Sequence, residues 1–300
     1  PSGYDAVVIP IHHTMNKQTY AEPWKQIADT WQKFSVGARP SPKNIQDMEE
    51  FLLVAIQKKN DVRALVYGST PEIRDMLAAH KNISVTVLDA SKEMYQAMTS
   101  LMANNTDQET FVEGDWLTTD LGEHTFDASF GDFTKGNVTY EKQYTLYEQT
   151  ARRLKQDGVH IERISSRFEH TQVHDEQAVL DKFSKIAPTT APAEQLMWEL
   201  IFLTHHNTIC TTDRVFEVLQ THKHLPHMLE YLAIISELIS PGKSWDYGRG
   251  WGEEKKPIEA YFDILEKRKD DTMFADWAYV FAMRPKSKNF MTRVPYICPL

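Results

Sequence analysis

The sequence has few features of a secreted or membrane-bound protein. Cys210 and Cys298 are its only cysteines, which is too few for a disulfide framework and favours a reducing compartment. No apolar run approaches the roughly 18 residues that a membrane-spanning helix needs. The first residues, PSGYDAVVIPIHH, lack the basic segment and the long apolar core of a secretory signal. These absences predict a cytoplasmic protein that makes no use of a membrane.

Positive charge and metal-binding motifs are also scarce. The 33 Lys and Arg residues are outnumbered by 42 Asp and Glu residues, which gives a formal net charge of −9. A field of this sign repels polyanions, so we expect a small-molecule partner rather than a nucleic acid. Histidines cluster at 12–13, 205–206 and 222–227, but no set has the spacing of a zinc site and no HEXXH motif occurs. We therefore expect no metal.

Two helices are predicted before residue 60. Residues 20–36 place apolar side chains three and four positions apart, which is the pattern of one buried helical face. A second helix is expected from Asn44, as its N-cap, to Lys59. We interpret residues 1–60 as an N-terminal helical lid.

From residue 61 onward, short apolar runs alternate with helical patterns. This order is typical of consecutive crossover units, and so of a parallel sheet with helices on both faces. The fold class predicted is α/β with a Rossmann-like core over 61–166. Its expected strands are 62–68, 84–91, 110–116, 126–133 and 158–166.

The character of the sequence changes after residue 166. Residues 174–239 read as three or four helices, and we interpret 167–256 as a helical insert that serves substrate binding or dimerisation. The pattern of PIEAYFDILEKRK, at 257–269, indicates a further helix, and 273–285 indicates a late strand. Residues 257–300 would then complete the sheet. The insert also leaves open whether the protein forms a homodimer.

The first two strands end in residues that suit a ligand. In an open α/β sheet, ligands bind at the carboxyl ends of the strands. The first strand leaves through Tyr67-Gly68-Ser69-Thr70, where Gly68 allows close approach of the backbone and the next helix start can hold a carboxylate. The second ends at Asp89, about twenty positions later, as suits hydrogen bonding to a ribose diol.

The third and fourth strands each end in a glycine, an acid and an aromatic residue. The carboxylate of Asp115 can accept from an exocyclic amine while the ring of Trp116 packs on a heterocycle. Asp132 and Phe133 repeat the pattern. Each residue also has a simpler interpretation: Asp89 as a cap of the helix that begins at Ser91, Asp115 as a solvated turn residue, Trp116 as core, and Asp132 as a cap or turn.

The successive segments LVYGSTPE, VTVLDAS, FVEGDW and FDASFGDF resemble the cofactor motifs of class I S-adenosylmethionine-dependent methyltransferases. They are most similar to the branch whose loop reads G-x-T-P-E. The resemblance implies S-adenosyl-L-methionine as cofactor, with the methionine moiety at the first loop, the ribose at the second and the adenine at the third. The cofactor-binding residues that it implies are Tyr67, Gly68, Ser69, Thr70, Asp89, Ala90, Gly114, Asp115, Trp116 and Phe133.

The activity expected from this resemblance is methyl transfer to an oxygen or nitrogen of a small molecule. Asp132 is the candidate catalytic residue. Candidate substrate contacts are Tyr4, His13, Tyr247 and Arg249. Two alternatives stay open: a transferase that moves another group of the same cofactor, and a catalytically inactive methyltransferase-like subunit. A dinucleotide dehydrogenase is disfavoured because the first loop lacks G-x-G-x-x-G.

Overall fold

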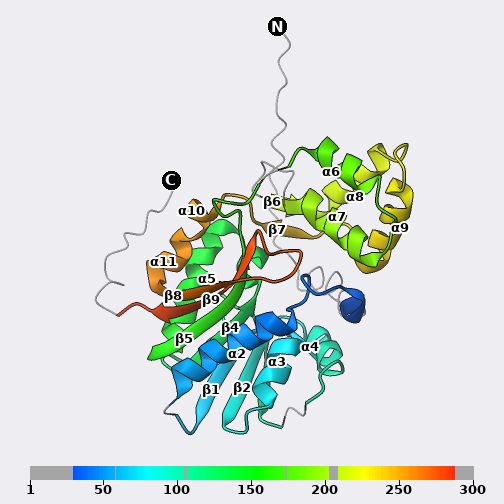
Figure 1. The fold of residues 1–300 in the computed structure, drawn as a ribbon. Coiled ribbons are helices and arrows are strands. Elements are labelled where there is room, and N and C mark those ends of the chain that lie inside the picture. Colours follow the sequence, from blue (N-terminus) through cyan, green and yellow to red (C-terminus); the bar gives the residue numbers. More distant parts are fainter. Residues whose placement is uncertain (1–29, 58, 105–106, 173, 203–208, 288–300) are drawn as a thin grey trace.

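The structure is a computed structural model that describes residues 30–57, 59–104, 107–172, 174–202 and 209–287. At its centre is a seven-stranded sheet with the order β3-β2-β1-β4-β5-β9-β8 (Figure 1). β1 to β5 run parallel, β9 is antiparallel to β5, and β8 is antiparallel to β9. The strands are β1 (Val62–Tyr67), β2 (Ile83–Asp89), β3 (Glu109–Glu113), β4 (Phe126–Asp132), β5 (Leu154–Ser165), β8 (Phe262–Lys269) and β9 (Ala278–Pro285).

Strand order reverses between β1 and β4, which is the switch point at which open α/β sheets bind ligands. The predicted order of the five parallel strands is confirmed. Their bounds differ from the predicted ones by a few residues, and most at β5, which begins at Leu154 rather than at Gly158.

Helices cover both faces of the sheet, because side chains along each buried strand alternate between the two. In β1, Ala64 and Val66 pack with α2 (Pro42–Ile56) and α3 (Pro71–Ala78). Leu65 and Tyr67 point to the opposite face, toward α5 (Tyr140–Arg153) and α11 (Lys256–Tyr261). The remaining helices around the sheet are α4 (Lys92–Thr99) and α10 (Trp251–Glu254).

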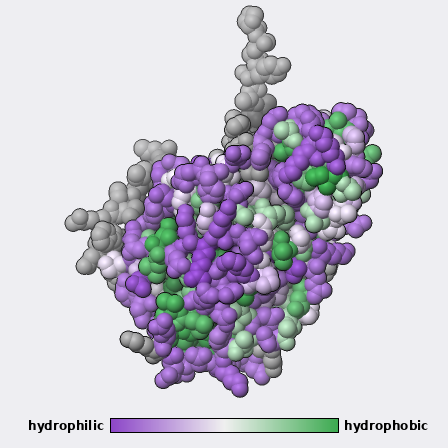
Figure 2. Space-filling view, in the orientation of Figure 1, coloured by the Kyte–Doolittle hydropathy of each residue, from purple (hydrophilic) through white to green (hydrophobic). Residues whose placement is uncertain are grey.

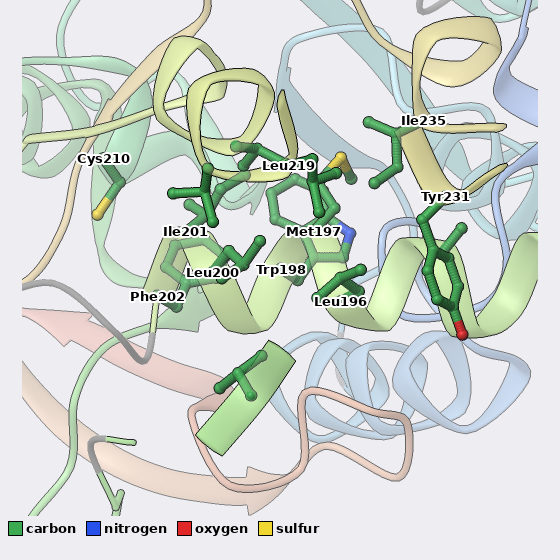
Figure 3. Packing of buried hydrophobic residues seen from close by; sticks show 14 of the residues in the cluster. Leu196, Met197, Trp198, Leu200, Ile201, Phe202, Cys210, Leu219, Tyr231 and Ile235 are labelled. Carbon is green, nitrogen blue, oxygen red and sulfur yellow. The ribbon is translucent and has the colours of Figure 1, made fainter. Parts of the chain in front are cut away.

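The segment between β5 and α10 folds around a core of its own, which we call the helical cap. In Figure 3 the side chains of α7, from Leu196 to Phe202, meet those of Cys210, Tyr231 and Ile235. From Ala193 to Phe202 every residue of α7 except Gln195 is buried, so this part of the helix lies in the middle of the cluster. The cap contains α6 (Glu176–Phe183), α7 (Thr190–Phe202), β6 (Ile209–Thr211), α8 (Thr212–Thr221), α9 (Met228–Leu238) and β7 (Ser244–Asp246).

The chain before α2 connects the cap with the sheet. It contains a 3-10 helix, η1 (Trp31–Lys33), and we call residues 30–41 the strap. Phe34 is buried in one cluster with Met98 of α4 and Leu238 of α9. The amide and the hydroxyl of Ser35 donate to the carboxylate of Glu194 on α7, at 2.8 and 2.5 Å. The strap therefore lies between the two parts of the molecule.

Two predictions about helices need correction. Asn44 is not the N-cap of α2: Ser41 caps it, and the two side chains form a reciprocal capping box with both hydrogen bonds at 3.0 Å. The helix predicted over 257–269 ends at Tyr261, and Phe262 begins the edge strand β8. The predicted helix over 20–36 lies mostly outside the described residues.

The face seen in Figure 2 is mostly hydrophilic, with small apolar patches. One patch overlies α2, which exposes Leu53 and Val54. Within the described part of the chain, no helix combines the length and the apolar composition that a membrane crossing requires.

A buried ion pair fastens α3 to the sheet. Arg74 on α3 donates through Nε and Nη2 to the two carboxylate oxygens of Glu109 on β3, at 2.9 and 2.6 Å. Nη2 also donates to Thr99 of α4, and the guanidinium lies 4.5 Å above the ring of Tyr95. Because both charged side chains are almost fully buried, each depends on the other for compensation.

We predict that Arg74→Met lowers the free energy of unfolding by about 3–5 kcal/mol, because the substitution leaves the Glu109 carboxylate buried without its partner. Urea denaturation followed by circular dichroism measures the change. The control is Arg284→Met, which removes an exposed arginine from β9 and is expected to change stability by less than about 0.5 kcal/mol. Equal effects of the two substitutions would contradict this account of the pair.

Candidate functional site

Little is packed over the turn after β1, at Gly68. Gly68 has a φ of 80°, a backbone conformation that side chains other than glycine's rarely adopt. A Cβ at Gly68 would meet a single side-chain atom within 4 Å, Cζ2 of Trp116 at 3.6 Å. Thr70 precedes α3 as its N-cap, and Pro71 is the first helical residue. The Thr70 side chain makes no capping hydrogen bond, so its hydroxyl is not committed to the helix.

The carboxylate of Asp89 lies beside this turn, at the end of β2. The hydroxyl of Ser69 donates to Oδ2 at 2.6 Å, and the amide of Ser91 donates to Oδ1 at 3.1 Å. Burial raises the pKa of the Asp89 carboxyl. The helix α4 is capped by the hydroxyl of Ser91, which accepts from the amide of Met94, so Asp89 does not serve as its N-cap. Each carboxylate oxygen keeps a further lone pair for a ligand.

Trp116 and Asp115, after β3, point in different directions. The indole N–H of Trp116 donates to the carbonyl of Leu88 at 2.8 Å, and its ring meets that of Tyr67 edge to face. The exposed carboxylate of Asp115 accepts from the amide of Leu117 at 2.7 Å, which is the geometry of a turn. Trp116 therefore packs as core on one side while its outer edge borders the Gly68 turn.

Asp132, the last residue of β4, is buried against Arg163 of β5. Arg163 donates through Nε to Oδ1 at 2.6 Å and through Nη2 to Oδ2 at 3.3 Å. Burial raises the pKa of the Asp132 carboxyl, although the guanidinium beside it acts in the opposite direction. The next residue, Phe133, has a φ of 53°, and its ring lies 4.1 Å from the guanidinium carbon. Strained backbone of this kind gathers at functional sites.

Glu72 is a third acid at this edge of the sheet, and it is partly buried. It is the second residue of α3, accepts from the indole N–H of Trp31 at 3.1 Å, and pairs with Arg39 at 3.2 Å. Burial raises the pKa of the Glu72 carboxyl, and the nearby Asp132 acts in the same direction. Glu72, Asp89 and Asp132 thus make the carboxyl ends of β1, β2 and β4 acidic, and the strap reaches the same edge through Trp31 and Arg39.

Tyr247 joins this edge to the cap. Its ring is buried 5.3 Å from the ammonium of Lys135, which itself pairs with Glu254 at 2.6 Å. Tyr247 packs directly against Gly136. A Cβ at position 136 would lie 2.0 Å from Cζ of the phenol, so only glycine fits there. Arg249 lies farther out, with its guanidinium carbon 4.5 Å above the ring of Tyr140.

Two narrow adjoining pockets lie between the sheet and the cap. Both are lined by Ser165 at the end of β5, and by Phe202 and Tyr247 from the cap side. One extends toward Phe133, and the other toward Arg167. No group of three or more histidine, cysteine or acidic side chains within the described residues is placed to hold a metal ion.

The structure brings the residues predicted at the ends of β1 to β4 to one edge of the sheet. Tyr247 and Arg249 lie on the cap side of that edge. Tyr4 and His13 lie outside the described residues. Sequence reasoning did not identify Glu72, Arg163 or Arg167 as members of the site. Arginines inside or just after an apolar strand are a usable signal, because a buried arginine requires a partner.

No protein-family model matches the chain, and no curated protein matches it in sequence. Among solved structures, it is similar to the CcbJ methyltransferase from Streptomyces caelestis, with a TM-score of 0.51, 14% identity, and coverage of 88% of this chain and 98% of that chain. It is also similar to the 1,6-didemethyltoxoflavin-N1-methyltransferase from Burkholderia thailandensis, with a TM-score of 0.50, 10% identity, and coverage of 90% and 87%.

A third similar structure is described as a zinc-dependent alcohol dehydrogenase from Rhodobacter sphaeroides, with a TM-score of 0.54, 14% identity, and coverage of 91% of this chain and 100% of that chain. At these levels of identity, the likenesses show a shared fold rather than a shared chemistry. The chain has the Rossmann-like methyltransferase fold, with a mostly parallel seven-stranded sheet covered by helices on both faces.

Proposed function

We propose that this protein transfers the methyl group of S-adenosyl-L-methionine to an oxygen or nitrogen atom of a small molecule. The observation that carries the proposal is the acidic edge at the switch point of the sheet. Three carboxyl groups, those of Glu72, Asp89 and Asp132, gather there, and burial raises the pKa of each, so each gains from further positive charge nearby. A ligand with an ammonium and a sulfonium group supplies such charge. The two methyltransferases of similar fold support the same activity.

The residues present fit this cofactor. The space over Gly68 is open to a ligand except for the edge of Trp116, as close approach of the methionine moiety requires. Asp89 keeps lone pairs for the two ribose hydroxyls, and Ser69 fixes its orientation. In the proposed arrangement Tyr67, Ser69, Thr70 and Ala90 border the ligand from the first two strand ends. Gly114, Asp115 and Trp116 border its adenine, and Phe133 lies near its sulfonium.

When bound, the cofactor supplies a methyl group that is already activated for displacement. The protein then has to align an acceptor atom and exclude water, and such orientation lowers barriers by up to about 7–11 kcal/mol in ideal cases. The strained backbone of Phe133 lies at the carboxyl end of β4, where that alignment would occur. The strap and the cap close the same edge from two sides.

Asp132 is the proposed proton acceptor for an acceptor group that must lose a proton. Its raised pKa makes it a stronger base than an ordinary carboxylate, and Arg163 holds it in one orientation through two hydrogen bonds. Tyr247 and Arg249 are proposed to border the acceptor from the cap, and Tyr4 and His13 from the amino-terminal segment.

The proposed division of labour follows the contacts of the strap and the cap. Residues 1–60 act as the lid, 61–166 bind the cofactor, 167–256 bind the acceptor or a second subunit, and 257–300 complete the sheet. A cytoplasmic location is part of the proposal, because two cysteines in the whole sequence are too few for a disulfide framework.

The first test is calorimetric titration with S-adenosylmethionine and, separately, with S-adenosylhomocysteine. We expect micromolar binding that Asp89→Ala weakens at least about tenfold, because the ribose loses its acceptor, a cost of about 1.4 kcal/mol. Asp61→Ala is the matched control, since it removes an exposed carboxylate at the opposite end of β1. Well-folded protein that binds neither ligand would refute autonomous activity and favour an inactive subunit. Product mass distinguishes methyl transfer from transfer of another group.

A second prediction concerns Asp132, assayed with an acceptor found by screening phenols and amines for methylated products. Asp132→Asn should lower kcat by about a hundredfold or more, with an unchanged KM for the cofactor. A base must be deprotonated, so activity of the unmodified protein should fall as pH drops through the raised pKa of Asp132, and the variant should lack this acidic limb.

The control is Asp270→Asn, which removes the other buried carboxylate near Arg163, at 3.5 Å. It should lower the melting temperature without removing the acidic limb. If Asp132→Asn retains both the rate and the pH profile of the unmodified protein, Asp132 is not the proton acceptor.

A further inference from the structure

Arg153, the last residue of α5, is buried behind the proposed cofactor site. Its Nη1 donates to the carbonyl of Trp116 at 2.8 Å and to the phenol oxygen of Tyr67 at 3.1 Å. Its Nη2 donates to the carbonyl of Thr119 at 2.6 Å. All three acceptors are neutral oxygens, and the rigid fork of a guanidinium fixes the positions of the groups that it binds. Arg153 therefore joins the end of α5 to β1 and to the segment that follows β3.

The segment after β3, residues 114–119, is a single compact turn. The amide of Thr119 donates to the carbonyl of Asp115 at 3.0 Å, and a Cβ at Gly114 would lie 2.1 Å from Oγ1 of Thr119. A lone turn leaves its later carbonyls without helical partners, and a guanidinium placed on them satisfies them and offsets the negative end of the turn's dipole. Arg153 therefore stabilises a segment that is too short to keep its conformation alone.

This turn carries Trp116, and its indole ring is held by the same group of contacts. The indole N–H donates to the carbonyl of Leu88, and the ring meets that of Tyr67 edge to face, with 6.2 Å between the centroids. The guanidinium carbon of Arg153 lies 5.9 Å from the centroid of the Tyr67 ring. Arg153 thus holds Trp116 through its backbone and through the ring behind it. The indole edge that borders Gly68 depends on both.

We propose that Arg153 is a positioning residue of the cofactor site and that it acts through Trp116. The inference rests on the proposed function for the identity of the ligand. The indole makes the contact with the adenine, and Arg153 determines where the indole lies. A wall that is fixed before the ligand arrives loses less conformational entropy on binding, so loss of Arg153 weakens binding of the cofactor.

The first test is calorimetric titration of variants with S-adenosylhomocysteine. We expect Arg153→Met to weaken binding by about tenfold or more, because the turn loses its hydrogen bonds from a charged donor. Arg153→Lys should retain part of the affinity, since it keeps the charge but lacks the fork. Arg152→Met is the matched control at the neighbouring position. Arg152 is exposed and pairs with Glu123, so its loss should leave binding unchanged.

Two further readouts distinguish action through Trp116 from a general loss of stability. In a double-mutant cycle, Trp116→Phe should itself weaken binding, and Arg153→Met added to it should cause little further loss. Independent action of the two residues would make the losses multiply. In the ligand-free protein, the fluorescence of Trp116 is the difference from the matching Trp116→Phe protein. Acrylamide should quench it more strongly in Arg153→Met, but not in Arg152→Met.

Melting temperatures establish that each variant is folded, and Arg153→Lys carries the same comparisons if Arg153→Met does not fold. Unchanged affinity in the folded variant would overturn the inference, as would losses that multiply in the cycle or unchanged quenching of Trp116. If the unmodified protein binds the ligand and the variant binds it equally well, the role of Arg153 falls and the proposed function stands. If the unmodified protein binds neither S-adenosylmethionine nor S-adenosylhomocysteine, both fall.

Discussion

The guanidinium of Arg163 connects segments that are far apart in the sequence. From the middle of the sheet it pairs with Asp132 on the adjacent strand and donates to the carbonyls of Gly37 and Arg39 in the strap, at 2.9 and 3.2 Å. Asp270, in the loop between β8 and β9, lies 3.5 Å away. A charge buried this deeply must be compensated, so β4, the strap and the β8–β9 loop have to meet at one place.

The consequence is that β5, the strap and the β8–β9 loop surround Asp132 at the acidic edge of the sheet. Because the strap returns over the carboxyl ends of the strands, Glu72 is partly covered by Trp31 and Arg39, and the side chain of Asp132 is only 5% exposed. Water that would otherwise screen these carboxylates is excluded, which raises their pKa values and strengthens their attraction for a cation. The cap lies next to the end of β5, where the two narrow pockets lie.

Much of the sheet could be predicted from the sequence, because alternation of apolar runs and helical patterns is a local property. The same alternation predicted where the strands end, and so it placed Asp89 and Asp132 at those ends. β8 was missed because FDILEKRK is an edge strand: beyond Phe262 its side chains are mostly exposed, so no clean two-residue period appears. Its pairing with β9, which is a tertiary contact, decides its structure.

The site was predictable in position but not in detail. Asp89 and the Gly68 turn could be predicted because their motifs follow two consecutive predicted strands. Arg163 has its partners only because β4, β5, the strap and the β8–β9 loop meet at one place. Arg167 borders a pocket only because the cap lies over the end of β5. A linear pattern contains neither contact. Trp116 illustrates the limit: its sequence position fits both a core ring and a ligand wall, and in the structure its N–H bonds to Leu88 while its edge borders Gly68.

The most direct test of the central claim is a crystal structure of the protein with S-adenosylhomocysteine. The account predicts that the ribose hydroxyls hydrogen-bond to the carboxylate of Asp89, that the amino-acid end lies over Gly68, and that the sulfur faces Asp132 and Phe133. A ligand bound elsewhere would contradict it. So would crystals grown at saturating ligand in which Trp116 covers the Gly68 turn and no ligand is seen there.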